Sequence, residues 1–250
     1  MDQIIVKMEL DSGCLPIVLQ WVNPGQFTMS NSFLVNPKAE DDAVGTFEVM
    51  ISYGYWMATY PITLCQWQLL MYKNPLSDTH LSVGSNHPVT NITWHEAIDF
   101  CQRLNSKPLP KPEGYSFGLP TEAQWEYACR ANTKYQYQIG NNTKDLSQVA
   151  WHRNNASGPK PVAQKAPNLW GFYDMLGNIS EMCLDGTTFY PDNTTQTDWV
   201  GDMPLEGPWR TKRGGNVVID PIEAINCSTR SEFETTDKDL LTGFRICLKK

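Results

Sequence analysis

The stretch NLWGFYDMLGNISEM, residues 168–182, lies in a half of the chain that has no helical periodicity. Two shorter stretches follow it, RGGN at 213–216 and GFR at 243–245. From about residue 133 to the C-terminus, Gly, Asn, Asp and Pro recur every few residues. This pattern predicts loops and short strands, with a tight turn at Gly177 because glycine adopts backbone conformations that other residues avoid.

The composition predicts one domain over residues 1–250. With 41% apolar residues, the 250-residue chain has enough material for a sizeable core. No linker, low-complexity segment or fixed-period repeat divides it. The formal net charge of -7 disfavours nucleic acid as a partner, because phosphate binding needs a concentrated basic surface.

The N-terminus and the cysteines bear on the cellular location. Residues 1–7 carry an early acid, Asp2, and only a brief apolar run, so neither a signal peptide nor a membrane span is predicted if Met1 is the native start. We then expect a cytoplasmic protein without a membrane partner. The seven cysteines include no CxxC pair, which favours reduced, buried thiols over a disulfide framework.

Three capping boxes predict three helix starts. Thr63, Thr93 and Thr121 are each followed, three residues later, by Gln or Glu. In such a box the Thr hydroxyl accepts a backbone N–H while the later side chain reaches back to the N-terminal end of the helix. After the second box, apolar residues fall at helical spacing and predict an amphipathic, packed helix: Trp94, Ala97, Ile98, Cys101 and Leu104.

The first fifty residues favour strands. Apolar runs at 4–6 and 15–22 alternate with turn residues such as those at 23–25, which predicts strands and a hairpin. The β-branched and apolar content of residues 47–52 predicts a further strand.

Two more motifs complete a family resemblance. PVTNITW at 88–94 and GLPTEAQWEYACR at 118–130, taken in order with the three C-terminal stretches, resemble the formylglycine-generating enzyme, or sulfatase-modifying factor, family. The resemblance spans roughly residues 20–248. It implies an α+β fold: a single irregular domain of the formylglycine-generating-enzyme type, related to C-type lectins, with two main helices.

The same resemblance implies that copper is absent. Family members that oxidise a substrate cysteine to formylglycine have a copper-binding cysteine pair shortly after the RGG motif. Here residues 216–226 read NVVIDPIEAIN, and Cys227 aligns better with a structural cysteine of the family. Because Cu(I) prefers sulfur ligands, we expect neither copper nor formylglycine-generating activity.

A calcium site is better retained than the copper site. In the family, the equivalent loop binds a cation, which implies side-chain ligands from Asp174 and Glu181 and backbone carbonyl ligands from Gly177 and Ile179. Oxygen ligands of this kind suit Ca²⁺. The alternative is that Asp174 caps a turn and Glu181 pairs with a nearby arginine.

Two functions remain open. The first is a non-catalytic binding module in which loops near 150–160 and 186–235 contact another protein or a small ligand, with Gly186–Pro208 as the main candidate. The second is an oxidoreductase of the same fold that acts on a small molecule or peptide. Its acid–base residues or metal ligands would be Asp220, Glu223 and His152.

Overall fold

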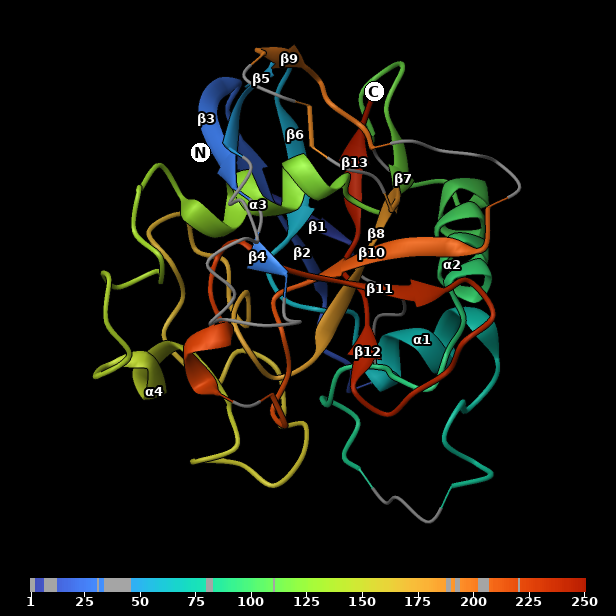
Figure 1. The fold of residues 1–250 in the computed structure, drawn as a ribbon. Coiled ribbons are helices and arrows are strands. Elements are labelled where there is room, and N and C mark those ends of the chain that lie inside the picture. The colour runs from blue at the N-terminus through green and yellow to red at the C-terminus, as the bar shows by residue number, and fades with distance from the viewer. Residues whose placement is uncertain are drawn as a thin grey trace.

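The chain folds into three small sheets, with α1 and α2 at one side, α3 among the strands and long connecting loops below them (Figure 1). The computed structural model describes residues 3–6, 13–30, 32–33, 46–79, 83–109, 111–187, 190–191, 194–201, 207–219 and 221–250. Mixed sheets with few helices make the fold α+β, as expected.

The first sheet has the strand order β1-β2-β6-β13-β7. Its C-terminal strand lies between two earlier strands, with Cys247 opposite Met57 on one side and Gly118 on the other. The end of the chain therefore ties together segments that are far apart in sequence. The strands are β1 (Gln3–Val6), β2 (Ile17–Val22), β6 (Tyr55–Ala58), β7 (Ser116–Gly118) and β13 (Cys247–Lys249).

The second sheet has the order β12-β8-β10-β11-β4. Strand β8 continues directly from the stretch at 168–182 and is buried along nearly its whole length. The register between β8 and β10 shifts between Arg210 and Lys212. The strands are β4 (Ser32–Phe33), β8 (Ser180–Gly186), β10 (Trp209–Arg213), β11 (Thr229–Glu234) and β12 (Thr242–Gly243).

The third sheet has the order β3-β5-β9, which leaves β3 at one edge. Strand β5 confirms the strand predicted at 47–52 and pairs antiparallel with β3 and parallel with β9. The strands are β3 (Gly25–Ser30), β5 (Thr46–Ile51) and β9 (Gln196–Thr197).

The three predicted helix starts are confirmed, each with both hydrogen bonds of its capping box. Helix α2 buries the predicted face against the first sheet, with Ile98 only partly buried. Helix α3 is buried at every position, so it runs through the core rather than over it. The helices are α1 (Leu64–Met71), α2 (Trp94–Ser106), α3 (Glu122–Arg130), the single turn α4 (Leu146–Val149) and the 3-10 turn η1 (Ile222–Ala224).

The hairpin predicted in the opening residues forms between the apolar runs at 4–6 and 15–22, because β1 pairs antiparallel with β2. The turn at 23–25 instead leads from β2 to β3, which pairs with β5 in a different sheet. The prediction for the cysteines is partly wrong. Cys14 and Cys65 form a disulfide rather than remaining free. Because the two cysteines are 51 positions apart in the sequence, no local spacing pattern predicts that they pair.

The other five cysteines are free and buried, as expected. Within the described ranges, no helix has the length and hydropathy needed to cross a membrane.

Candidate functional site

Three loops meet at the place where the family resemblance puts its chemistry. We call the group of loops formed by residues 151–155, 174–180 and 213–219 the loop face; residues 174–180 are buried, and the exposed positions of the group are Arg153, Asn154 and Val218. The Gly177 amide donates to the Gly214 carbonyl at 2.9 Å, and the Asn178 amide donates to the Trp151 carbonyl at 2.9 Å. These backbone hydrogen bonds fix the loops relative to one another.

Gly177 is required at the centre of the loop face. Its φ is +70°, a left-handed conformation that favours glycine. A Cβ atom added there would lie 2.1 Å from the carbonyl oxygen of Trp151. The tight turn predicted at this position is therefore confirmed. The atoms that a side chain at Gly177 would meet belong to the backbone of Trp151.

Asp174 is buried beneath this turn. Its Oδ2 accepts a hydrogen bond from the Ala163 amide at 2.7 Å, and its Oδ1 accepts one from the Asn178 side chain at 3.3 Å. Burial raises the pKa of Asp174 to about 6, although the Ala163 hydrogen bond opposes that rise. The carboxylate thus serves as the acceptor for two neighbouring loops.

Glu181 makes a buried ion pair with Arg245. The two side chains have no exposed area, and the guanidinium donates to both carboxylate oxygens at 2.6 and 2.7 Å. The indole N–H of Trp125 donates to the same carboxylate at 2.8 Å. Arg245 also donates to the Ala58 and Tyr173 carbonyls. This geometry matches the alternative in which Glu181 pairs with an arginine.

These contacts define how the residues fit a calcium ion. Asp174 and Glu181 are electrostatically coupled, so the structure does bring the two predicted ligands near each other. Both carboxylates already accept hydrogen bonds from protein donors. Ile179, which lies between Asp174 and Glu181 in the sequence, is fully buried. In the part of the chain that the structure describes, no three His, Cys, Asp or Glu side chains gather at one point. Calcium binding would require Glu181 to give up at least part of its pairing with Arg245, and it stays a prediction.

His152 is a structural residue of the loop face. Its side chain is buried, with one ring nitrogen 2.8 Å from the Ser147 hydroxyl and the other accepting from the Asn154 amide at 3.3 Å. Burial lowers the pKa of His152, and the nearby Lys165 charge lowers it further. A neutral ring held on both sides is not free to transfer a proton to a ligand.

The structure describes one of the other two candidates. Glu223 is exposed on the turn η1, where its carbonyl accepts hydrogen bonds from Tyr137 and Asn226. Asp220 lies outside the described residues. The hydrogen bonds of the His152 ring go to Ser147 and Asn154, and no hydrogen bond between described residues joins His152 to Glu223.

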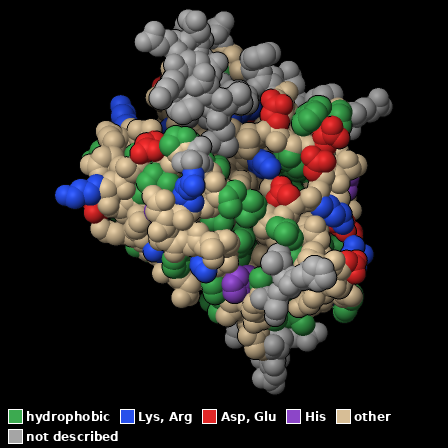
Figure 2. All heavy atoms as spheres, turned by 60° about the horizontal axis from the view of Figure 1, so that its bottom comes forward, with side chains coloured by type: hydrophobic (Ala, Val, Ile, Leu, Met, Phe, Trp, Pro, Cys, Tyr) green, Lys and Arg blue, Asp and Glu red, His purple; other side chains and the backbone are tan. Residues whose placement is uncertain are grey.

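The exposed tip of the loop face is apolar. Asn216 donates to the Ser180 hydroxyl and accepts from the Val218 amide, and this leaves the Val218 side chain 54% exposed. Figure 2 shows this lower end of the molecule, where hydrophobic side chains gather near the middle and acidic side chains lie toward one side.

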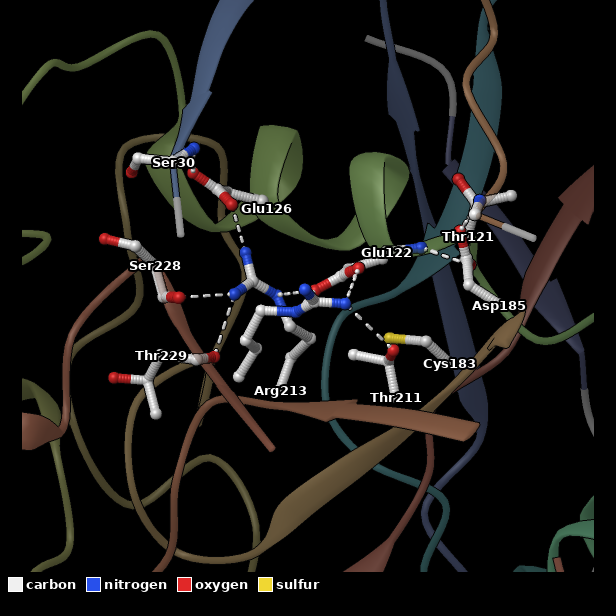
Figure 3. A network of polar contacts seen from close by, with 12 residues as sticks. Ser30, Thr121, Glu122, Glu126, Cys183, Asp185, Thr211, Arg213, Ser228 and Thr229 are labelled. Carbon is white, nitrogen blue, oxygen red and sulfur yellow. Dashed lines mark hydrogen bonds and ion pairs between the residues drawn. The ribbon is translucent and has the colours of Figure 1, made fainter. Parts of the chain in front are cut away.

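Beneath the loop face lies a buried charge network (Figure 3); the sequence indicates Glu126 as a core charge that pairs within the fold, but not its partner. Arg213 pairs with Glu126 of α3 and donates to the Ser228 and Thr229 carbonyls at 2.6 and 2.9 Å. Glu122, one turn earlier on α3, pairs with Arg230 at 2.8 Å. The signal that would have found this network is the i, i+4 spacing of two acids, Glu122 and Glu126, on a helix that is buried at every position.

The long segment Gly186–Pro208 is attached to the core where it is described. The rings of Tyr190 and Trp199 both pack on Phe47, at centroid distances of 5.0 and 5.2 Å. Strand β9 pairs with β5, and the Asp198 carboxylate accepts from the Ser52 amide at 2.8 Å. Within the described part of this segment, Gln196–Thr197 belongs to the third sheet, and Val200 is an exposed apolar residue.

A second surface lies on the other side of α3. A groove of about 550 Å³ runs between β3, Glu48 of β5 and residues 127–134. We call it the β3 groove. Sequence reasoning missed it because it depends on how α3 packs beside an edge strand.

Cys129 and Cys227 are also neighbours, although the sequence indicated no partner for either. Burial raises the pKa of the Cys129 thiol, and the adjacent Cys227 raises it further. Both thiols are buried, so neither belongs to the loop face.

Comparisons with known proteins agree with the fold. A family profile described as the sulfatase-modifying factor enzyme 1-like domain matches residues 18–250. The chain is similar to the chaperone protein LppX of Paenibacillus barcinonensis, with 25% identity over 242 residues that cover 78% of this chain and 80% of LppX. It is also similar to the formylglycine-generating enzyme of Mus musculus, with 26% identity over 183 residues, 67% of this chain and 46% of the mouse protein. The chain thus spans less than half the length of that enzyme.

Two solved structures share the architecture over nearly the whole chain. Treponema denticola variable protein 1 superposes with a TM-score of 0.81 at 21% identity and covers 99% of both chains. PvdO from Pseudomonas aeruginosa superposes with a TM-score of 0.73 at 17% identity, covering 99% of this chain and 98% of PvdO.

Proposed function

Because the chain belongs to the sulfatase-modifying factor enzyme 1-like domain family, we propose that it is a binding module that uses the family scaffold to contact another protein or a small ligand. The observation that carries this proposal is the loop face. Its polar groups pair with one another, and its tip presents an exposed valine, Val218.

A fixed loop face suits binding better than chemistry. Asp174 and His152, the ionisable side chains expected there, are buried and hold neighbouring loops in place. The free thiols in the described ranges are buried, and burial raises the pKa of Cys101 and Cys247 to about 12. A thiol becomes a good nucleophile or metal ligand when its pKa is low and the thiolate is accessible.

One relative supports protein binding. LppX is named as a chaperone, and the similarity covers about four fifths of both chains. At 25% identity this likeness does not identify a partner, and function must come from the site rather than from the fold.

Two finer expectations remain part of the proposal. A structural calcium ion at Asp174 and Glu181 is retained as a prediction that the stability measurements below test. A cytoplasmic location is retained too, although the Cys14–Cys65 disulfide counts against it because disulfides persist mainly in oxidising compartments.

The test uses partner capture with matched variants. Wild-type protein, Val218→Asp on the loop face and Val200→Asp on the segment Gly186–Pro208 are each used to capture proteins from an extract of the source cells. Ile5→Asp is the control, because Ile5 is 53% exposed, close to the 54% of Val218, and lies on β1 outside both surfaces.

We expect a partner retained by the wild type and by Ile5→Asp to be lost with Val218→Asp, since a buried charge at an interface is costly. The same set of captured proteins with Val218→Asp as with the wild type would remove the loop face from the proposal. Loss with Val200→Asp alone would move the contact to the segment Gly186–Pro208.

A further inference from the structure

Among the described residues, the outer edge of β3 has backbone groups without a strand partner, as the pairing pattern shows. In an antiparallel pair, residues alternate between those whose backbone groups face the partner strand and those whose groups face away. The Ser30 amide donates to the Glu126 carboxylate of α3 at 3.2 Å, so Ser30 faces away from β5. By alternation, Thr28 and Gln26 face away from β5 as well.

The pairing of β5 with β9 independently shows that the backbone groups of Gln26 face away from β5. The Met50 carbonyl accepts from the Asp198 amide at 2.8 Å, so Met50 faces β9 and not β3. Met50 lies opposite Gln26 in the register. Gln26 and Thr28 are exposed, and β3 has no second strand neighbour among the described residues. Their N–H and C=O groups therefore form an open edge.

The β3 groove lies along this edge, with α3 on its far side. Ser30 closes one end, because both Glu126 and Arg130 bond to it. At the other end the Tyr127 ring packs on Phe27, with centroids 5.2 Å apart, and the Tyr127 hydroxyl approaches Gly25. Between these ends, the groove is open where Thr28 and Gln26 present their backbone groups.

The charged side chains in the groove differ in the hydrogen-bond and ion-pair partners that they have. Glu48 accepts hydrogen bonds from Thr28 and Gln26, which lower its pKa together with the nearby Lys134 charge. Arg130 is engaged by Glu126, Ser30 and the Tyr135 carbonyl. Lys134 is exposed and makes neither a hydrogen bond nor an ion pair within the described residues. Although the whole chain is acidic, the unused charge in the groove is positive.

From these observations we propose that the β3 groove binds an extended peptide segment that adds a strand to the edge of β3 and places an acidic side chain against Lys134. Main-chain hydrogen bonds to Gln26 and Thr28 give such a segment its register, as in other cases of strand addition. Lys134 selects for a carboxylate. This surface is separate from the loop face, so it goes beyond the proposed function and does not depend on it.

The experiment uses a defined probe. A fluorescein-labelled, end-capped hexapeptide of alternating Thr and Val with one central Glu is titrated with the full chain and followed by fluorescence polarisation. A second peptide carries Lys in place of Glu, and a third carries a central Pro that cannot pair along both edges. Thermal unfolding of each variant confirms that it is folded.

Thr28→Pro removes the outward N–H without removing a hydrogen bond to β5, and prolines are tolerated at such edge positions. We expect binding of the Glu peptide to weaken about tenfold or more. Thr28→Val keeps the N–H and loses only the hydroxyl to Glu48, so it is the matched comparison and should weaken binding much less than Thr28→Pro does. Equal binding by Thr28→Pro and Thr28→Val would overturn the strand-addition geometry.

Lys134→Glu tests the charge. We expect about tenfold weaker binding of the Glu peptide and recovered binding of the Lys peptide, whereas Lys107→Glu, the same change outside the groove, leaves both unchanged. No binding by the wild type, equal binding of the Pro peptide, or self-association of the chain that Lys134→Glu abolishes would each overturn the proposal. The last result would assign the groove to a second copy of the chain.

Discussion

The loop face and the β3 groove lie on opposite sides of α3 and differ in how their polar groups are satisfied. On the loop face, backbone amides and buried carboxylates pair within the chain, and a buried ion pair between Glu181 and Arg245 lies below. In the groove, the outward backbone groups of Thr28 and the ammonium group of Lys134 have no such partners in the part of the chain that the structure describes.

The comparison indicates that the loops where the family resemblance places its chemistry differ from the surface where this chain has polar groups available for binding. Polar groups that pair internally stabilise a fixed shape, and they have little left to offer a ligand. Polar groups that lack a partner within the chain can still form hydrogen bonds to a ligand. The comparison predicts that substitutions on the loop face act on stability and that substitutions in the groove act on binding.

The largest expected effect comes from Arg245→Met. It leaves the Glu181 carboxylate buried without its counter-charge, so we expect the free energy of unfolding to fall by about 3–5 kcal/mol in urea denaturation with a chelator present. Arg103→Met is the control, because its pair with Asp99 is exposed and should change stability by less than about 0.5 kcal/mol.

Calcium sharpens that experiment. If Glu181 can bind the ion when its arginine is absent, calcium should restore stability to Arg245→Met and leave Arg103→Met unchanged. An Arg245→Met variant as stable as the wild type without calcium would show that the ion pair does not organise the loop face.

Glycine substitutions compare how much stability each region loses when a Cβ atom is added. Gly177→Ala places a Cβ against the Trp151 carbonyl at a positive φ, and we expect a cost of roughly 2–4 kcal/mol. Gly25→Ala places a Cβ against the Tyr127 hydroxyl, the far end of a side chain, so roughly 1–2 kcal/mol is expected. A larger loss of stability for Gly25→Ala than for Gly177→Ala would contradict the view that the loop face is the more rigid region.

The most gradual effect is the pH dependence that Asp174 contributes. Its pKa in the folded protein, about 6, lies above the value of 3.8 for a free side chain. Between about pH 4 and pH 6 the folded state therefore holds the proton more tightly than the unfolded state, and the contribution of Asp174 to stability falls as pH rises, by at most about 3 kcal/mol.

Asp174→Asn lacks this titration, so subtracting its unfolding free energy from that of the wild type isolates the effect. We expect the difference to decline between about pH 4 and pH 6 in chelator. A difference that instead grows with pH on adding calcium would show that the ion binds the ionised carboxylate.

Local features of the fold could be predicted from sequence. The capping boxes at Thr63, Thr93 and Thr121 form as expected because both hydrogen bonds of each box lie within four residues. The strand at 47–52 and the buried face of α2 follow from side-chain periodicity. The motif order also fixed the family, which the profile match confirms.

Features that depend on distant contacts could not be predicted. The Cys14–Cys65 disulfide, the pairing of Arg213 with Glu126 and the neighbouring thiols of Cys129 and Cys227 join residues that only the folded chain brings together. The β3 groove depends on the register of β3 with β5, and local patterns do not determine that register.

The most direct measurement is a copper(I) titration of the reduced protein against a competing chelator, followed by oxygen uptake in the presence of a cysteine-containing peptide. The account predicts that the chain takes no stoichiometric copper from the chelator and that oxygen uptake stays at the background rate, because the loop face presents no accessible thiol in its described residues. One tightly held copper per chain, with oxygen consumption and conversion of the peptide cysteine, would contradict it.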